Sequence, residues 1–397
     1  MIDGPIAPGF EKIRDAFEEN FTHRKELGAA VCIYLGGVKV VDLWGGYLDA
    51  EKKRAWTIDS RVMVFSVTKG MCALAMAHLV SKRKISYETK ISSIWPEFSQ
   101  HGKENITLRQ LLEHRAGLFS INERITPELL LDKQKFSTVL AKQEPEQIGK
   151  VAYHAQTVGW YLSEICHRVD EQGRYIGQYL EEELIKPLNL NFKIGLDMSD
   201  DMSTVSGLTS HSAIELLFSE TNVSLSMILQ LLNPFSQASR ALKNPHFSRP
   251  SDMIAPPWPY CEMPSSNGIG TVRSIACMWQ LVLDKHYLPV RLREELVASL
   301  REDPVERPDS IIGHPMRYHY GFTRPGRSIH FGVSDQAIGF AGIGGAFSFA
   351  DPSLGVTYAY APNRLGPVMW DDPRERALRI ALFETLESLG ITNDPTQ

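Results

Sequence analysis

The sequence Phe65-Ser66-Val67-Thr68-Lys69-Gly70 places a hydroxyl and an ammonium group three residues apart, where a buried helix is predicted to begin. Residues three apart on a helix share a face, so Lys69 can reach back to the Ser66 hydroxyl. The free N–H groups at the start of a helix also favour negative charge nearby. The stretch therefore predicts a serine nucleophile with an activating lysine beside it.

The same spacing occurs at Ser81 and Lys84, and position along the helix separates the two pairs. Residues 67–80 are apolar nearly all round, which predicts a buried helix. Ser81 falls at its far end, where Lys84 and its basic neighbours are typical of solvated charges near exposed carbonyls. For Ser66 the alternative is an ordinary helix-capping serine followed by a surface lysine, and spacing alone leaves both interpretations open.

Composition excludes several classes of function. The chain has 397 residues, 43% of them hydrophobic, which is enough for two lobes or one large two-layer domain. The net charge is −5 and no run of Lys or Arg exceeds the three at 82–84, so nucleic acid and anionic membranes are not expected partners. We expect a small-molecule partner, and the sequence leaves the oligomeric state open.

Two further features concern compartment and cofactors. The N-terminal residues lack the basic and apolar regions of a signal peptide, and no window approaches a membrane span, so a cytoplasmic protein is expected. The five cysteines are scattered and odd in number, which favours reduced thiols over disulfides or a zinc site. No metal or cofactor is predicted.

Both ends of the chain predict the same kinds of element. Each end carries a pair of strand-like runs joined by a turn, and one amphipathic helix. The strands are predicted at 29–35 and 38–43 and at 346–349 and 356–361, and the helices at 9–22 and 374–389. The economical architecture is α+β, with one antiparallel sheet covered by the terminal helices. We expect residues 1–64 and 310–397 to form this domain and 65–309 to form an inserted, mostly helical domain.

The middle of the chain adds candidate site residues. A short helix is predicted at 108–114 with Thr107 as its cap, and Gly117 ends it. Tyr153 is expected on the loop that leads into a helix beginning near Val158. The proline-rich residues 234–266 are predicted to form one long loop over the lobe or at the rim of a pocket.

Five spaced motifs resemble one family, the serine β-lactamase-like group that includes class C β-lactamases, serine DD-peptidases and family VIII carboxylesterases. They occur in the family's order and together span nearly the whole chain. The motifs are Ser66-Val67-Thr68-Lys69, Leu111-Leu112-Glu113-His114-Arg115-Ala116-Gly117-Leu118, Tyr153-His154-Ala155, Ser266-Asn267-Gly268-Ile269-Gly270-Thr271, and Gly339-Phe340-Ala341-Gly342-Ile343-Gly344-Gly345 followed by Asp351-Pro352.

The resemblance implies a β-lactamase/transpeptidase-like fold with the active site in a cleft between the two domains. It implies Ser66 as the nucleophile that becomes acylated, Lys69 as general base or its electrostatic partner, and Tyr153 as a second acid/base. A tyrosine near a buried lysine is further expected to be drawn towards phenolate. The main-chain N–H groups of Ser66 and Ile343 are the implied oxyanion donors, with Gly342 beside them. His114 is expected to be structural, and His154 is expected to have a solvent-facing or structural role, with a place in the pocket as the alternative.

Two departures from the family's motifs shape the expected substrate. Ala155 stands where penicillin-hydrolysing members have an asparagine, and Phe340 stands where the family has lysine or histidine. A phenyl ring cannot anchor a substrate carboxylate. We therefore expect a carboxylesterase-type serine hydrolase acting on small neutral esters or amides. The alternatives are weak β-lactam turnover, or a catalytically decayed fold kept as a binding or scaffold protein.

Overall fold

A single antiparallel sheet of eight strands organises the protein, whose structure is a computed structural model. It describes residues 2–211, 223, 225–284, 288–297, 306–332 and 334–392. The strand order is β1-β3-β2-β14-β13-β12-β11-β10. These strands are β1 (Ile2–Asp3), β2 (Gly28–Leu35), β3 (Val38–Gly46), β10 (Tyr318–His319), β11 (Phe322–Thr323), β12 (Ile338–Ala341), β13 (Phe347–Asp351) and β14 (Val356–Pro362).

The centre of the sheet joins the two ends of the chain. β2 and β3 form the predicted hairpin, whose turn residues Gly36 and Gly37 have φ angles of 56° and 81° that suit glycine. The predicted second pair, β13 and β14, is also present, and β14 pairs with β2 from Val356 opposite Leu35 to Pro362 opposite Ala29. The predicted strands at both ends therefore meet in one sheet.

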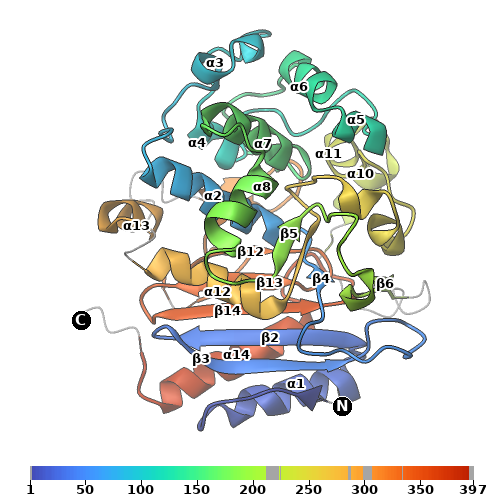
Figure 1. Ribbon diagram of the computed structural model, residues 1–397, viewed down its shortest axis with the longest axis vertical. Helices are drawn as coiled ribbons and strands as arrows, with labels where there is room; N and C mark the ends of the chain where they lie inside the picture. Colours follow the sequence, from blue (N-terminus) through green and yellow to red (C-terminus); the bar gives the residue numbers. More distant parts are fainter. Residues whose placement is uncertain are drawn as a thin grey trace.

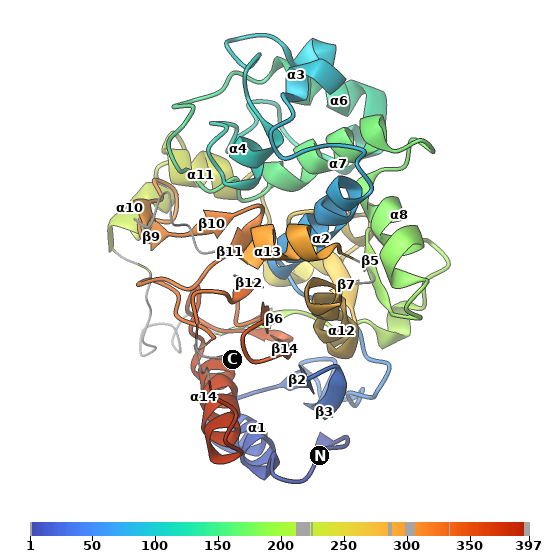
Figure 2. The same cartoon turned by 90° about the vertical axis from the view of Figure 1, so that its left-hand side faces the viewer.

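Alternation along β2 divides the core between the two faces of the sheet. Val31 and Ile33 pack in a cluster with residues of the two terminal helices, whereas Cys32 packs in a cluster with residues of α12. The terminal helices, α1 (Glu11–His23) and α14 (Pro373–Ser388), lie side by side under one face (Figure 1). On the other face α12 (Val272–Leu283) lies between the sheet and α2 (Val67–Ser81) (Figure 2).

The other helices lie above α12 in the view of Figure 1. They are α3 (Ile91–Ile94), α4 (Leu108–Leu112), α5 (Pro127–Leu131), α6 (Lys133–Lys142), α7 (Thr157–Val169), α8 (Ile176–Leu180), α10 (Leu225–Leu232), α11 (Gln237–Leu242) and α13 (Val290–Val297). The α+β class with a β-lactamase/transpeptidase-like fold is confirmed. The domain boundaries stay a prediction, and α12 lies on the sheet although it belongs to the range 65–309.

A small second sheet fixes the start of α2. It joins β4 (Val62–Met63), β7 (Gly268–Gly270) and β5 (Phe192–Ile194). The N–H of Gly268 donates to Thr68 Oγ1 at 2.9 Å, and a Cβ atom at Gly268 would lie 2.7 Å from that oxygen and 2.4 Å from the Phe192 ring. Only glycine therefore allows this close approach between β7 and the first turn of α2. Two further strand pairs are β6 (Thr209–Ser210) with β15 (Arg364–Leu365) and β8 (Arg307–Pro308) with β9 (Pro315–Met316).

The prediction of one long loop over 234–266 was wrong. The segment contains α11 and two 3₁₀ helices, Pro250–Ile254 and Trp258–Tyr260. The Ser236 side chain accepts from the N–H of Ser239 and so caps α11, and a proline occupies the first turn of each 3₁₀ helix. The prolines begin helices here instead of excluding them.

Within the described ranges, none of the helices combines the length and apolar character that a membrane crossing needs.

Candidate active site

Ser66 stands at the N-cap position of α2, yet its side chain makes no capping hydrogen bond. The hydroxyl is therefore free for another use, unlike that of a simple capping serine. The residue before it, Phe65, has a φ angle of 48°, in the left-handed region that costs a bulky residue on the order of 1 kcal/mol. Such strain is typical of sites where the backbone must present one side chain.

Lys69 lies one turn further along α2 and reaches back to Ser66. Its Nζ atom is 3.1 Å from Ser66 Oγ and donates to the main-chain oxygen of Ser265 at 2.8 Å. Burial lowers the pKa of the Lys69 amine to about 7, an effect that Cys72 opposes weakly. A substantial fraction of Lys69 is therefore neutral near pH 7 and able to accept a proton.

Tyr153 reaches the same hydroxyl from the segment before α7, as predicted. Its phenol donates to Ser66 Oγ at 2.9 Å, and its ring centroid lies 4.9 Å from Lys69 Nζ. The expectation of a phenolate is wrong. Burial raises the pKa of Tyr153; the hydrogen bond with Ser66 lowers it and Asp309 raises it further. Because the pKa of Tyr153 is raised while burial lowers the pKa of Lys69, the phenol keeps its proton in the resting site and Tyr153 stays a proton donor.

The turn after β12 brings a second main-chain donor to this region. Among the described residues, the N–H groups of Ser66 and Ile343 have no hydrogen-bond partner. The N–H of Gly342, by contrast, donates to Ala346 O at 2.7 Å, and a Cβ at Gly342 would lie 2.5 Å from Val64 O. Gly342 therefore allows the turn to approach the strand that leads into Ser66. Ile343 itself is 51% exposed.

Phe340 and Ala155 are apolar residues next to Tyr153, and we refer to them as the apolar wall. Both are buried, and the Phe340 ring lies 6.4 Å from the Tyr153 ring and 5.8 Å from Lys69 Nζ. The N–H of Ala155 donates to Tyr153 O at 2.9 Å, which tightens the loop that carries the phenol. Neither position offers a group that could bind a carboxylate.

The two histidines in these motifs form hydrogen bonds with main-chain groups near Tyr153. His154 is fully buried; its Nε2 accepts from the N–H of Leu118 at 3.0 Å and its Nδ1 lies 2.6 Å from Ala152 O. His114 Nδ1 accepts from the N–H of His154 at 3.1 Å. Burial lowers the pKa of His154 to about 4, which keeps the ring neutral. Both contacts agree with the structural role expected for these histidines.

Comparison with known proteins adds an independent observation. The model of the β-lactamase family matches residues 13–383. The chain belongs to this family. A curated relative, the esterase/beta-lactamase LipL of Mycobacterium tuberculosis (strain ATCC 25618 / H37Rv), is 31% identical over 378 residues, which are 94% of this chain and 85% of LipL.

Solved structures agree with this membership of the β-lactamase family. A family VIII carboxylesterase superposes with a TM-score of 0.84 at 30% identity, covering 97% of this chain and 100% of that one. EstA from Arthrobacter nitroguajacolicus Rue61a has a TM-score of 0.82 at 25% identity, covering 98% of this chain and 99% of EstA. A penicillin-binding protein homologue from Caulobacter crescentus has a TM-score of 0.81 at 28% identity, covering 97% of this chain and 100% of the homologue.

Sequence reasoning missed two groups at the site of this β-lactamase-family member. One is the main-chain oxygen of Ser265, which no side-chain pattern can reveal. The other is Asp309, whose carboxylate accepts from the N–H of Tyr153 at 3.1 Å. The sequence does carry a signal for Asp309. An aspartate between Pro308 and Ser310 is typical of a turn in which the side chain accepts hydrogen bonds from nearby main-chain N–H groups.

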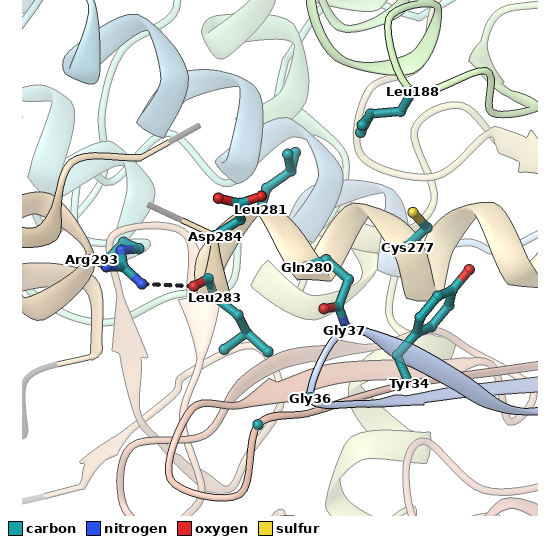
Figure 3. A pocket seen from close by; sticks show the side chains of 11 residues that line it. Tyr34, Gly36, Gly37, Leu188, Cys277, Gln280, Leu281, Leu283, Asp284 and Arg293 are labelled. Atoms are coloured by element: carbon teal, nitrogen blue, oxygen red, sulfur yellow. Dashed lines mark hydrogen bonds between the residues drawn. The ribbon is translucent and has the colours of Figure 1, made fainter. Parts of the chain in front are cut away.

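Other features of this β-lactamase-family member lie apart from the site. The second serine–lysine pair is structural, because Ser81 Oγ donates to His78 O at 2.6 Å and Lys84 pairs with Glu171 at the surface. A cavity of about 670 Å³ is lined by residues of β2 and α12, and in Figure 3 Tyr34 points toward Cys277 there. None of its lining residues belongs to the Ser66 site. In the ranges that the structure describes, no three potential ligand side chains converge as a metal site requires.

Proposed function

We propose that the protein is a serine carboxylesterase that hydrolyses small neutral esters through an acyl-enzyme on Ser66. One observation carries the proposal: the half-buried Ser66 hydroxyl has Lys69 Nζ at 3.1 Å and the Tyr153 phenol at 2.9 Å. A base and an acid on one nucleophilic hydroxyl are what acyl transfer needs. The relatives named as esterases support the same class of reaction.

In the first step, neutral Lys69 takes the Ser66 proton as Oγ attacks the ester carbonyl. The pKa of about 7 makes Lys69 a base at neutral pH without a large penalty for its protonation. The carbonyl oxygen becomes an oxyanion, which we expect to accept hydrogen bonds from the N–H groups of Ser66 and Ile343. Tyr153 remains protonated during this step.

In the second step, the tetrahedral intermediate collapses and the bond to the alcohol oxygen breaks. The electron pair leaves with that oxygen, which takes the phenol proton of Tyr153. The resulting phenolate regains a proton from the Lys69 ammonium, which returns to the neutral amine. Water then attacks the acyl carbon and passes a proton through Tyr153 to Lys69. The bond between that carbon and Ser66 Oγ breaks, Oγ takes the proton from the Lys69 ammonium, and the carboxylic acid leaves.

Substrate class follows from the apolar wall. Phe340 and Ala155 leave no cationic or amide group to bind a carboxylate, whereas they suit the acyl part of a neutral ester. A second candidate is slow β-lactam hydrolysis, because LipL is named as both an esterase and a β-lactamase and acylation needs only the nucleophile, base and oxyanion donors. The missing carboxylate anchor favours esters.

Covalent labelling tests the proposal. A fluorophosphonate probe phosphonylates an activated serine, so wild-type protein should be labelled and Ser66→Ala should not. Ser81→Ala is the matched control, because Ser81 has the same spacing to a lysine without a nearby base, and it should label like wild type. An unlabelled wild type would reject the enzyme and favour the scaffold alternative. Turnover of a p-nitrophenyl ester against a chromogenic cephalosporin then separates the two enzymatic candidates.

We further propose that the site is assembled from both predicted domains. Ser66, Lys69 and Tyr153 come from residues 65–309, while Phe340 and Ile343 come from 310–397. A reducing, cytoplasmic compartment fits the five cysteines, all of which carry free thiols.

A further inference from the structure

A buried carboxyl group supports the backbone of Tyr153 from a distant part of the chain. Asp309 is 1% exposed and follows Tyr153 by 156 residues. Its Oδ1 atom accepts from the N–H groups of Tyr153 at 3.1 Å, Ile311 at 2.9 Å and Ile312 at 3.1 Å. One oxygen thus ties the start of the Tyr153 loop to the turn at 309–312.

The second oxygen of Asp309 supports the Tyr153 ring through a neighbour. Tyr318 donates its hydroxyl to Asp309 Oδ2 at 3.2 Å. Its ring lies nearly parallel to the Tyr153 ring, at 8° with centroids 6.2 Å apart. The His114 ring meets both edge-on, 4.9 Å from Tyr153 and 4.5 Å from Tyr318. The phenol of Tyr153 is therefore held at its main chain and along its ring.

The Asp309 carboxyl group has no cationic partner among the described residues, and it accepts hydrogen bonds from neutral N–H and O–H donors. The pKa of Asp309 is raised overall, because burial raises it more than these donors lower it. Such an arrangement is expensive for a purely structural residue, because a buried carboxylate without a cation loses much of its hydration energy. Besides the two N–H groups of its own turn, Asp309 contacts the main chain of Tyr153 and the hydroxyl of Tyr318, whose ring stacks on that of Tyr153.

We propose that Asp309 is a positioning residue for Tyr153, which keeps the phenol oxygen where it can protonate the departing alcohol. The inference rests on the proposed ester hydrolysis. In that reaction the bond between the acyl carbon and the alcohol oxygen breaks, and the oxygen keeps the electron pair and takes the Tyr153 proton. An alkoxide needs this proton in order to leave, whereas a nitrophenolate leaves as a stable anion. A displaced Tyr153 should therefore slow alkyl esters more than nitrophenyl esters.

The test compares two esters of the same acid. For Asp309→Ala we expect kcat/KM to fall about 10²-fold for the ethyl ester and less than about tenfold for the p-nitrophenyl ester, within the usual range for positioned proton transfer. Tyr153→Phe should show the same selectivity. Asp309→Asn should recover part of the ethyl ester rate, because its amide oxygen can still accept from the N–H of Tyr153.

Two further variants separate positioning from folding. Tyr318→Phe removes only the hydroxyl bonded to Asp309 and keeps the stacked ring, so it should fold and slow the ethyl ester selectively. Asp42→Asn is the control, because Asp42 is also a buried carboxylate but pairs with Lys39 at 2.6 Å and Arg273 at 3.0 Å, outside the contacts of the site. It should change both rates equally.

Equal losses on both esters in folded Asp309→Ala and Tyr318→Phe would overturn the inference, as would no loss in either. Failure of the proposed function looks different, since wild-type protein would then hydrolyse neither ester and would not label at Ser66.

Discussion

The main-chain oxygen of Ser265 accepts a hydrogen bond from Lys69 Nζ at 2.8 Å. A carbonyl oxygen can only accept, so it occupies one N–H of the amine in either protonation state. A neutral amine keeps one lone pair, and Ser66 Oγ at 3.1 Å is a hydroxyl within its reach. In the proposed reaction, this contact orients Lys69 for the transfer of the Ser66 proton.

The pH dependence of the reaction should report Lys69. Its pKa is lowered to about 7, and only the neutral amine can accept the Ser66 proton. We therefore expect kcat/KM for a neutral ester to be half-maximal near pH 7 and to fall about tenfold per unit at lower pH. Rates measured from about pH 5 to about pH 9 check this. A flat profile over that range would assign the proton transfer to another group.

Removal of the amine should abolish most of the activity. Lys69→Ala is expected to reduce ester turnover by about two to four orders of magnitude, the usual loss when positioned proton transfer is removed. Lys84→Ala is the matched control, because Lys84 has the same spacing to a serine but pairs with Glu171 at the surface. Its turnover should equal that of wild type. If Lys69→Ala kept the wild-type rate, Lys69 would have no part in the mechanism.

A proline substitution can test the second oxyanion donor. The turn from Gly342 to Gly345 has the N–H of Gly345 directed to Gly342 O at 3.4 Å and a φ of 87° at Gly344. These features are typical of a type II turn, which tolerates proline at its second residue, here Ile343. Ile343→Pro should therefore keep the turn, remove the N–H and lower kcat by about 10²–10³.

Ile343→Ala is the control for that experiment, because it keeps the N–H and shortens a side chain that is largely exposed. Its kcat should stay close to that of wild type. Equal activity of the proline variant, with an intact circular dichroism spectrum, would remove Ile343 from the oxyanion site.

Substrate charge should decide turnover at the Phe340 wall. Two p-nitrophenyl esters test this: that of monomethyl succinate is neutral, and that of succinic acid keeps a free carboxylate. We expect the charged ester to react at least about tenfold more slowly. An unpaired carboxylate against an apolar wall costs more than about 1.4 kcal/mol. Phe340→His should narrow the ratio by offering a polar partner. A preference for the charged ester would show that another group binds the carboxylate.

Local patterns in the sequence predicted the parts of the fold that local physics controls. Strand-like apolar runs joined by turn residues predicted both hairpins, and the apolar run after Ser66 predicted the buried helix α2. Thr107 was predicted as a cap, and its hydroxyl does accept from the N–H of Gln110. These features depend on neighbours a few residues away, which a single sequence records directly.

Interactions between distant segments were not predictable in this way. The Ser265 carbonyl reaches Lys69 across 196 residues, and every residue carries a carbonyl, so no residue type marks the one that is used. The protonation state of Tyr153 was predicted wrongly for a related reason. Its pKa depends on how deeply the fold buries it and Lys69, and burial at a site is a property of the whole structure.

The pairing of β2 with β14 has a consequence for biosynthesis. A ribosome would release β2, Ser66 and Tyr153 long before β14, which pairs with β2 from more than three hundred residues later in the chain. The segment that carries Ile343 is anchored on that late strand through β13. In the proposed mechanism, a nascent polypeptide thus contains the nucleophile before the second oxyanion donor is in place, and hydrolysis has to await nearly complete translation. Until then the unpaired edge of β2 is a surface that chaperones would need to shield.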